Sequence, residues 1–284
     1  MKNFYLITNN SKEPAIKAGK EIQSYLISKG ANCVIGEQLS AKPGEKITDM
    51  TSVPKDTECV IVLGGDGTIL HAAYDLADLD VVFLGINLGT VGFLASADAK
   101  DMYAAVDRML SNDYEIEERM MIFGECVVNG QTVSKPRALN EIVITGTRSL
   151  QMIYYTVYVN GKLLHKYGAD GAVVSTPTGS TGYNLSVGGP VINPSAKMII
   201  VTPICSHSLD NRSIVFDESD VIKIVIDESA NGIDYEAEAL FDASHSVKLK
   251  PGDEITITKS SKTTKLVKLN NETFLETLHK KLKG

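Results

Sequence analysis

Short β-prone runs alternate with helical patterns in the amino-terminal part of the chain, and this alternation restricts the fold more than any other feature of the sequence. Residues 4–8, 59–63 and 81–84 are apolar runs rich in β-branched side chains. Residues 14–29 and 102–110 instead carry apolar side chains at the spacing of a helix. Strands that alternate with helices pair in parallel, because each helix returns the chain to the same edge of the sheet. The pattern predicts a Rossmann-like α/β domain.

The residues beyond 119 follow a different pattern, in which short β-prone runs are separated by turn signals. Asn129-Gly130 and Asn160-Gly161 each lie between such runs, and Asn-Gly is the strongest short hairpin signal in a sequence. Pro251-Gly252-Asp253 is a further turn. Because long helical patterns are few here, we expect a β-rich, antiparallel, sandwich-like carboxy-terminal domain.

These patterns divide the chain into three parts. We expect a Rossmann-like α/β domain over residues 1–119, a β-rich domain over residues 120–261, and a strand and helix tail over residues 262–284. Apolar residues at helical spacing in the tail are Phe274, Leu275, Leu278 and Leu282. A helix this short is not stable alone, so the tail is expected to pack back on one of the domains.

Net charge and the length of apolar runs restrict the partners and the compartment. The 284 residues have a formal net charge of −7, whereas proteins that bind the nucleic-acid backbone present a basic surface. Polar residues follow the first apolar run at once, so no signal peptide is evident. No run approaches the roughly 20 apolar residues of a membrane-spanning helix. We therefore expect a cytoplasmic protein with neither a nucleic-acid nor a membrane partner.

The spacing of cysteine and histidine gives no sign of a disulfide framework or a structural metal. The four cysteines include no Cys-x-x-Cys pair, and the five histidines show no ligand spacing with each other or with cysteine. We expect reduced thiols and no fixed protein ligands for a metal.

A glycine-rich loop, Gly64-Gly65-Asp66-Gly67-Thr68, follows one β-prone run and precedes a helical pattern. Backbone N–H groups at a helix amino terminus bind anions, and glycines let a phosphate chain come close. Asp66 indicates catalysis, because a carboxylate repels phosphate unless it takes a proton or holds a metal. The alternative is an ordinary Gly-Asp-Gly turn. The loop has neither the Gly-Lys-Ser/Thr ending of a P-loop nor the Gly-x-Gly-x-x-Gly spacing of a dinucleotide fingerprint.

Two further loops carry small and polar residues. Residues 85–94 are rich in glycine and follow the next β-prone run, and an open parallel sheet binds its ligands at such strand ends. Residues 175–186 are mostly hydroxyl or small residues and offer donors to ribose, amide or phosphate groups. Tight turns and a solvated Ser/Thr/Gly loop are the alternatives. A catalytic triad from His207, Ser208 and Asp210 is set aside, because sequence neighbours rarely form one.

In order and spacing over residues 63–242, these motifs resemble the NAD kinase family. The motifs are Leu63-Gly64-Gly65-Asp66-Gly67-Thr68, Gly85-Ile86-Asn87 with Gly92-Phe93-Leu94, Asn140-Glu141, Ala169-Asp170-Gly171, residues 175–186 and residues 202–209. Gly-Gly-Asp-Gly alone is shared with lipid kinases and phosphofructokinases, whereas residues 175–183 and the Asn-Glu pair are more specific. The resemblance implies a kinase that transfers the γ-phosphoryl group of ATP to the 2′-hydroxyl of the adenosine ribose of NAD, giving NADP.

The resemblance also implies an architecture, partners and roles. In this family a Rossmann-like domain and a β-rich domain form an NAD site between them, usually in a homodimer or homotetramer. NAD and ATP are then the small-molecule partners, with a divalent cation, Mg²⁺, on the triphosphate. The family aspartate that matches Asp66 is the general base, and the pair that matches Asn140 and Glu141 holds the ribose and amide end of NAD. Neither glycine-rich loop holds a lysine or arginine; Arg148 and Lys166 are the cationic candidates nearest in sequence to the motif region, and solvated surface charges are the alternative for both.

The other site assignments are carried over position by position. Those for the phosphates are Gly64, Gly65, Gly67, Thr68 and His71. Those for NAD are Asn87, Phe93, Asn140, Glu141, Gly168, Asp170, Thr178, Thr181, Gly182, Tyr183, Asn184, Ser186 and Asp242. The chain departs from the family pattern at three places: Gly182 replaces an alanine, Ser206 replaces a proline, and Asp242-Ala243-Ser244 replaces Asp-Gly-Gln. The last change leaves the family glutamine without a counterpart.

Two other functions fit part of the pattern. A lipid or sugar kinase of the same superfamily would share the first glycine-rich loop, but an acidic chain offers no basic or amphipathic membrane patch. A non-catalytic NAD(P) sensor would not need Asp66. The phosphoryl donor is left open between ATP, another triphosphate and polyphosphate, as are the use of NADH and feedback by NADP.

Overall fold

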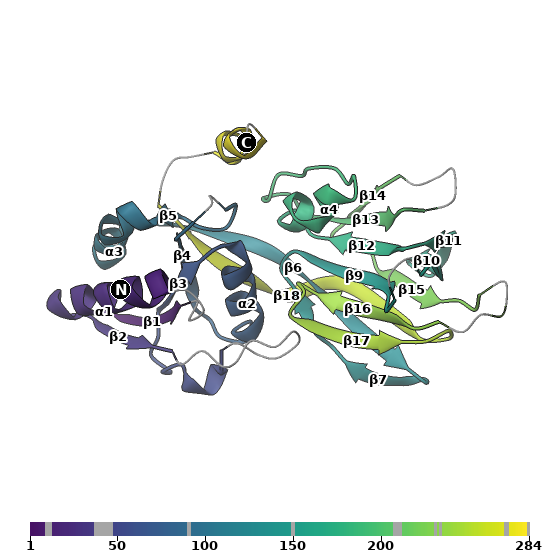
Figure 1. The fold of residues 1–284 in the computed structure, drawn as a ribbon, viewed down its shortest axis with the longest axis horizontal. Helices are drawn as coiled ribbons and strands as arrows, with labels where there is room; N and C mark the ends of the chain where they lie inside the picture. The colour runs from purple at the N-terminus through teal and green to yellow at the C-terminus, as the bar shows by residue number, and fades with distance from the viewer. Residues whose placement is uncertain are drawn as a thin grey trace. The chain divides into compact units, whose positions relative to one another are not determined.

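The chain, in a computed structural model, forms two compact units (Figure 1). The first unit comprises Met1–Arg119 and Thr263–Gly284, and the second comprises Met120–Lys262. The structure describes residues 1–8, 13–36, 48–89, 92–148, 151–206, 212–229, 232, 235–269 and 273–282. The division falls within two strands, β6 (Glu115–Val128) and β18 (Glu254–Lys268), each of which continues from one unit into the other.

A parallel sheet forms the centre of the first unit. Its strands are β1 (Asn3–Thr8), β2 (Asn32–Ile35), β3 (Cys59–Gly64) and β4 (Val82–Asn87), in the order β2-β1-β3-β4. The end of β18 pairs in parallel with β4, where Lys265 lies opposite Val82, and the short β5 (Ala97–Asp98) also pairs with β4. β3 and β4 are buried along their whole length, as expected for a sheet that is covered on both faces.

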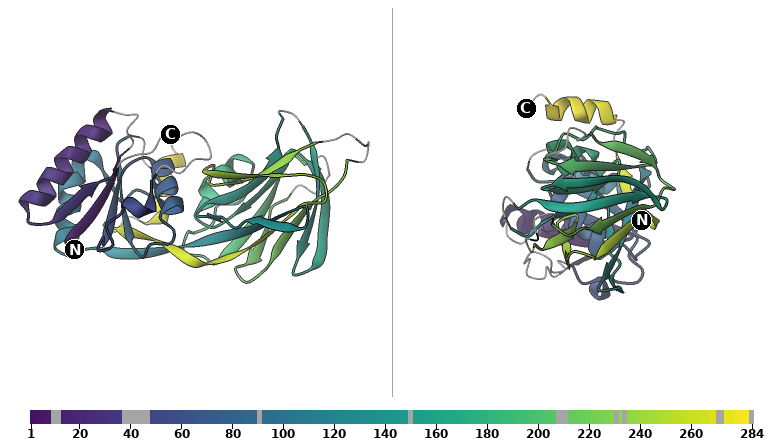
Figure 2. Two further views of the ribbon diagram at one scale, coloured as in Figure 1. Left: turned by 90° about the horizontal axis from the view of Figure 1, so that it is seen from below. Right: turned by 90° about the vertical axis from the view of Figure 1, so that its right-hand side faces the viewer.

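Helices cover both faces of this sheet (Figure 2). α1 (Glu13–Ser28) and α3 (Met102–Leu110) lie on one face, where Leu26 and Val106 join a buried cluster with the strands. α2 (Asp66–Asp75) lies on the other face. The step from β3 to β4 runs across the sheet in the opposite direction from the step from β1 to β2. Because both crossovers are right-handed, their helices lie on opposite faces. Two 3₁₀ segments, η1 (Met50–Ser52) and η2 (Ala99–Asp101), complete the unit. The predicted alternation of strands and helices is confirmed.

Two sheets form the second unit. One is antiparallel with the order β14-β13-β12-β9-β16-β17, and the other has the order β11-β10-β15-β18, with β6 beside β18. The strands of the first are β9 (Glu141–Gly146), β12 (Gly171–Ser175), β13 (Met198–Ile204), β14 (Ile214–Asp217), β16 (Ala237–Phe241) and β17 (His245–Leu249). The second adds β7 (Gln131–Ser134), β8 (Arg137–Ala138), β10 (Ile153–Val159), β11 (Lys162–Ala169) and β15 (Ile222–Ile226). The buried Tyr155 hydroxyl on β10 donates to the Gly171 carbonyl on β12 at 2.8 Å and so joins the two sheets.

Both Asn-Gly turns form the hairpins that the sequence predicts. Asn129 and Gly130 have φ angles of 51° and 75°, and Asn160 and Gly161 have φ angles of 51° and 77°. These left-handed values are those of a type I′ turn, which matches the twist of antiparallel strands. The turns join β6 to β7 and β10 to β11.

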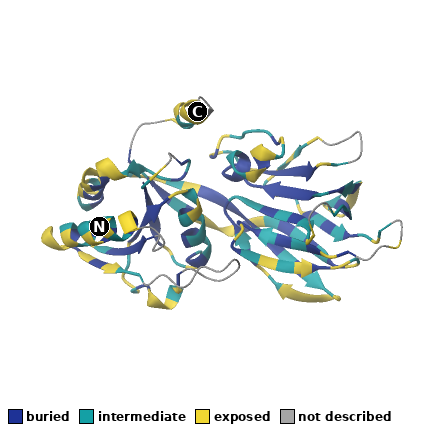
Figure 3. Cartoon of the chain, in the orientation of Figure 1, coloured by how far each residue is buried: buried dark blue, intermediate teal, exposed yellow. Residues whose placement is uncertain are grey.

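The end of the chain contributes a strand and a helix to the first unit. β18 continues without a break past residue 261, so the boundary expected there falls inside one strand. The helix predicted for the tail is present as α5 (Phe274–Leu282). None of its described side chains is buried, and Leu275 is 71% exposed (Figure 3). In the described part of the chain, no helix is long and apolar enough to cross a membrane.

Asp253 ties the predicted Pro251-Gly252 turn to the first hairpin of the second unit. Its buried carboxylate accepts the N–H groups of Asn129 and Lys250, each at 2.8 Å. Asp253→Ala removes both acceptors, so we expect it to lower the free energy of unfolding by about 1–3 kcal/mol in urea titrations. Glu228→Ala, an exposed carboxylate in the same unit, is the control and is expected to change it by less than about 0.5 kcal/mol. Equal losses in the two variants would contradict this role for Asp253.

Candidate functional site

The first glycine-rich loop joins the end of β3 to the start of α2. Gly65 precedes the first residue of the helix, and its carbonyl accepts the N–H of Thr68 at 2.9 Å. A Cβ atom on Gly64 would lie 2.3 Å from the Thr68 hydroxyl oxygen, so only glycine fits there. A Cβ atom on Gly65 or Gly67 would meet no other atom within 4 Å. The loop therefore presents an open backbone surface at a helix amino terminus, which suits a phosphate chain.

Asp66 is held by the second glycine-rich loop. Its Oδ2 atom accepts the Phe93 N–H at 2.7 Å, and its Oδ1 atom accepts the Leu94 N–H at 3.1 Å. A Cβ atom on Gly92 would lie 1.8 Å from Oδ1, so the backbone of the second loop lies directly against the carboxylate. The two loops predicted to lie at strand ends thus meet through the candidate base, which is fixed in one orientation before any substrate binds.

Asn87 and His71 have more local roles in this structure. Asn87 lies opposite Gly64 in the sheet, and its buried side chain accepts the N–H of Gly89 at 3.1 Å and donates to the Gly89 carbonyl at 3.0 Å. It thereby shapes the start of the second loop. His71 is half-buried on α2, where burial lowers the pKa of its imidazole against the opposing effect of Asp75. Contact of the Asn87 and His71 side chains with NAD and phosphate, respectively, stays a prediction.

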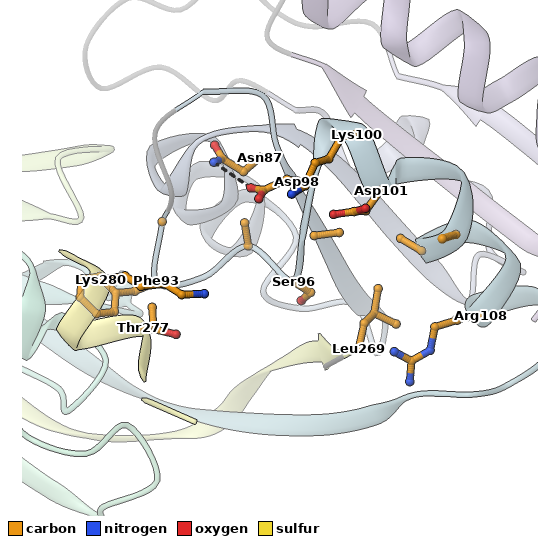
Figure 4. Close-up of a pocket in the computed structure, with 15 residues that line it drawn as sticks. Asn87, Phe93, Ser96, Asp98, Lys100, Asp101, Arg108, Leu269, Thr277 and Lys280 are labelled. Atoms are coloured by element: carbon orange, nitrogen blue, oxygen red, sulfur yellow. Dashed lines mark hydrogen bonds between the residues drawn. The ribbon is translucent and has the colours of Figure 1, made fainter. Parts of the chain in front are cut away.

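A cavity of about 460 Å³ opens beside the second loop (Figure 4). Gly92 and Phe93 line one part of it, and the other lining residues come from β4, the segment that leads through β5 and η2 to α3, the residue after β18, and α5. Its cationic side chains are Lys100, Arg108 and Lys280. No sequence motif marks these three cations. Arg148 and Lys166, the candidates that the sequence suggested, are exposed on the second unit.

The α5 helix contacts Phe93 directly. The ring centroids of Phe93 and Phe274 are 6.2 Å apart with 43° between the ring planes. The Lys281 ammonium lies over the Phe93 ring, 5.3 Å from its centroid. The carboxyl-terminal tail therefore belongs to the surroundings of a residue assigned to NAD, although no motif in the tail predicted this.

In the second unit, Asn140 and Glu141 lie at the start of β9, where Asp242 fixes their backbone. The Asp242 carboxylate accepts the N–H groups of Leu139 at 2.6 Å, Asn140 at 2.9 Å and Glu141 at 2.9 Å. Within the described residues, the buried atoms Asn140 Oδ1 and Glu141 Oε2 have no hydrogen-bond partner. Buried polar atoms are nearly always paired in proteins, so these two point to a ligand.

The small-residue loop packs closely on this pair. A Cβ atom on Gly179 would lie 2.2 Å from the Asn140 carbonyl oxygen, and one on Gly182 would lie 3.0 Å from Glu141 Oε2. The N–H of Thr176 donates to the Asn140 carbonyl at 2.8 Å. The structure therefore brings the Asn140-Glu141 pair together with Gly182 and Asp242, which lie far from it in sequence. A Cβ atom on Gly182 would also lie 3.2 Å from the Gly179 carbonyl oxygen and 3.3 Å from Asn140 Nδ2, so glycine lets the loop pack closely against this pair.

The other residues predicted in this loop differ in what they contact. The Asn184 side chain is fully buried, donates to the Pro190 carbonyl at 3.1 Å and accepts from the Thr202 hydroxyl at 2.8 Å, so it holds the loop against β13. Thr178 is buried, and its carbonyl accepts the Thr181 hydroxyl at 3.3 Å. Tyr183 is 44% exposed and Ser186 is also exposed, so both are open to a partner or ligand.

Gly168 and Asp170 lie where the chain passes from one sheet of the second unit to the other. β11 ends at Ala169 and β12 begins at Gly171. The Asp170 N–H donates to the Ile204 carbonyl at 3.0 Å, while its side chain is half-buried. The adjoining motif at residues 202–209 is described only as far as Ser206, so His207, Ser208 and Asp210 lie outside the described residues.

Burial sets the ionisation of the two carboxyl groups in the second unit. Loss of solvent and, to a lesser extent, the nearby Asp242 together raise the pKa of Glu141 to about 8, against the opposing effect of the Tyr183 N–H. Burial also raises the pKa of Asp242 to about 6, against the effect of its three N–H donors. Glu141 is therefore largely protonated at neutral pH and can donate a hydrogen bond. No group of three or more His, Cys, Asp or Glu side chains in the described ranges could hold a metal ion.

Comparison with protein-family models gives two adjacent matches. The ATP-NAD kinase N-terminal domain matches residues 4–114, and the ATP-NAD kinase C-terminal domain matches residues 139–269. Among curated relatives, the NAD kinase of Lachnoclostridium phytofermentans is 42% identical over 283 residues, which is 99% of each chain. The NAD kinase of Lachnospira eligens is 41% identical over 294 residues, which covers 99% of this chain and all of the relative.

Solved structures show the same architecture. Yeast NADH kinase in complex with NADH superposes with a TM-score of 0.89 at 23% identity, over 100% of this chain and 88% of the yeast chain. An NAD kinase from Archaeoglobus fulgidus in complex with ATP has a TM-score of 0.76 at 25% identity, over 100% and 99% of the two chains. The expected fold, an α/β unit followed by a β-rich unit, is confirmed.

The contact between Gly92 and Asp66 gives a test of how Asp66 is oriented. Gly92→Ala places a methyl group where Oδ1 lies, so the carboxylate must turn away from the Phe93 and Leu94 N–H groups. We expect kcat to fall by about 10²-fold, the cost of misplacing a reacting group by about 1 Å. Gly89→Ala is the matched control, because its Cβ meets no other atom within 4 Å, and it is expected to keep kcat. A Gly92→Ala enzyme as fast as Gly89→Ala would rule out this orientation.

The raised pKa of Glu141 predicts how stability depends on pH. Between pH 7 and 9 the folded protein releases the Glu141 proton near pH 8, whereas the unfolded chain has already released it. The folded state binds more protons in this window, so the free energy of unfolding falls as the pH rises, by about 1 kcal/mol. Glu141→Gln removes this titration and is expected to reduce the fall by that amount in urea titrations at pH 7, 8 and 9. A further fall near pH 9 remains, because burial raises the pKa of the Cys33, Cys59 and Cys126 thiols. An unchanged slope in Glu141→Gln would assign the effect to another group.

Proposed function

The chain belongs to the NAD kinase family and is an NAD kinase that transfers the γ-phosphoryl group of ATP to the adenosine-ribose 2′-hydroxyl of NAD, and from this premise we propose which of its residues carry out the reaction. The observation that carries the proposal is the Asp66 carboxylate, held in the phosphate loop by two N–H groups. Membership of this family separates the chain from lipid and sugar kinases that share only the glycine-rich loop.

Asp66 acts as the general base in this proposal. The 2′-oxygen of the ribose attacks the γ-phosphorus, its bond to phosphorus forms as the bond to the β–γ bridging oxygen breaks, and ADP leaves. Asp66 accepts the hydroxyl proton, a role worth typically about 10²–10⁴-fold in rate. The open backbone at Gly65 and Gly67, with Thr68, binds the triphosphate. Phosphoryl transfer depends mainly on positioning and charge stabilisation, which these fixed groups supply.

Asn140 and Glu141 bind NAD in this proposal. The observation that supports this is their two buried oxygens, Asn140 Oδ1 and Glu141 Oε2, which have no hydrogen-bond partner among the described residues. A protonated Glu141 can donate to a ribose or amide oxygen of NAD without placing a second negative charge near its diphosphate. Asp242 is a positioning residue, because its carboxylate is occupied by the backbone of residues 139–141. Phe93, Gly168, Asp170, Thr178, Thr181, Tyr183, Asn184 and Ser186 remain proposed NAD contacts.

A divalent cation, Mg²⁺, is proposed to enter with the nucleotide. The described residues offer no cluster of ligands for it, whereas Mg²⁺ prefers oxygen ligands and is commonly held by substrate phosphates. When bound, it neutralises charge on the triphosphate oxygens.

We further propose that the enzyme is cytoplasmic and that it forms a homodimer or homotetramer. Residues 1–119 and 120–261 are its two proposed domains, followed by the tail at 262–284. Parallel assays with polyphosphate in place of ATP, and with NADH in place of NAD, decide whether the enzyme uses either compound.

The defining experiment measures NADP formation from NAD and ATP with an NADP-specific dehydrogenase, with and without Mg²⁺. Parallel reactions replace ATP by polyphosphate and NAD by NADH. We expect NADP to form with ATP and to stop when EDTA removes the cation. If NAD binds in calorimetry but no donor yields NADP, the chain is a sensor and not an enzyme.

The role of Asp66 has a separate test. Asp66→Asn removes the proton acceptor and sets an amide NH₂ against one of the two N–H groups, so we expect kcat to fall by about 10²–10⁴-fold. NAD affinity, measured by calorimetry, is expected to change much less, because the 2′-hydroxyl is only one of many contacts. Asp56→Asn, an exposed aspartate of the first unit, is the control. Turnover within a few-fold of wild type in Asp66→Asn would show that Asp66 is not the base.

A further inference from the structure

The enzyme must hold two highly anionic substrates although its own net charge is −7. Neither glycine-rich loop contains a lysine or arginine. Besides the proposed Mg²⁺ and the backbone N–H groups, positive charge at the phosphates must therefore come from side chains elsewhere in the fold. Near the second loop, such cations come from α3 and from the last turn of α5, which carries His279, Lys280 and Lys281.

The contacts of α5 place this basic turn beside the reaction centre. The Phe93 N–H donates to Asp66 Oδ2 at 2.7 Å, so Phe93 adjoins the residue at which the phosphoryl group is transferred. The Lys281 ammonium lies 5.3 Å from the centroid of the Phe93 ring. Lys280 lines the cavity that Gly92 and Phe93 also line, and Figure 4 shows Lys280, Phe93 and Thr277 grouped at one end of it.

We propose that Lys280 and Lys281 are phosphate-binding residues of this enzyme, which contact the phosphates of the nucleotide bound at Phe93. The inference rests on the proposed function of Asp66 and Phe93. It makes α5, which no motif assigned to the site, part of the binding machinery. Because the helix has no buried side chain among its described residues, its stability gains from a ligand that pairs with its last turn.

Two other cations, Arg108 and Lys100, also line the cavity. The Arg108 Nε atom donates to the Asp113 carboxylate at 2.7 Å and to the Asp113 carbonyl at 3.0 Å, and Lys280 likewise interacts with the Glu276 carboxylate. Lys100 is exposed and is followed directly by Asp101, while the Asp98 carboxylate accepts from Asn87 at 3.5 Å. Of the cations near Phe93, the two α5 lysines stand out: Lys281 lies over the ring and Lys280 lines the cavity beside it.

The test compares Lys280→Gln, Lys281→Gln and the double variant with wild type in the full-length chain. Lys17→Gln, an exposed lysine on α1, is the matched control for the loss of one positive charge. Affinities for NAD and for a non-hydrolysable ATP analogue are measured separately by calorimetry, and KM and kcat are measured for both substrates. The two arms show whether the NAD diphosphate or the triphosphate is the partner.

We expect each single variant to raise the Kd and KM of one nucleotide by about two- to fivefold, the size of an exposed ion pair, with kcat nearly unchanged. The double variant is expected to show a larger loss and a weaker dependence of Kd on salt, since fewer ion pairs are screened. Lys281→Arg keeps the charge and is expected to restore binding.

Affinities in the Lys280 and Lys281 variants that match those of Lys17→Gln for both nucleotides would overturn the proposal. A rise in affinity would also overturn it, because it would show that α5 competes with the nucleotide for Phe93. Failure of the wild type to form NADP would instead refute the proposed function, and the binding measurements would still decide the role of the lysines.

Discussion

The pair of hydrogen bonds from Phe93 and Leu94 to Asp66 is the interaction on which the first unit's site depends. It joins the loop after β3 to the loop after β4, and it fixes a carboxylate at a helix amino terminus where phosphate is expected to bind. The sheet makes this possible, because β3 and β4 are parallel neighbours and both loops leave the same edge. Gly92 is required for the same reason, since any side chain there would occupy the position of the carboxylate. The backbone of the two loops therefore sets the orientation of the proposed base.

A second carboxylate organises the second unit in a similar way. Asp242 accepts three consecutive N–H groups and so holds Asn140 and Glu141 with their polar atoms free for a ligand. The chain adopts left-handed backbone at Asp242 and Ala243, with φ angles of 46° and 54°. A non-glycine residue in this region costs about 1–2 kcal/mol, and the three hydrogen bonds offset that cost. The resemblance suggested a missing glutamine contact at this point; the structure shows a turn whose aspartate acts on the backbone.

The carboxyl-terminal helix α5 adds positive charge beside the second glycine-rich loop. An acidic enzyme that binds two nucleotides needs local positive charge, and the phosphate loops supply only N–H dipoles. Three cationic side chains, from η2, α3 and α5, line one cavity beside the second glycine-rich loop. In the proposed NAD site, a protonated Glu141 would likewise add no negative charge near the ligand, because burial raises its pKa.

The sequence by itself determined the local features. The helical patterns form α1 and α3, the Asn-Gly pairs form hairpins, and Gly64–Thr68 forms the passage from β3 through Gly65 into α2, because spacing and turn chemistry act over a few neighbouring residues. Only the tertiary structure decided which distant groups meet: Phe93 with Asp66, 27 residues away, Asn140 with Asp242, 102 residues away, and α5 with Phe93. These meetings depend on strand order and on the burial of whole elements, which no local pattern records. The ionisation of Glu141 belongs with them, because a pKa depends on the solvent and charges that the completed fold leaves around the group.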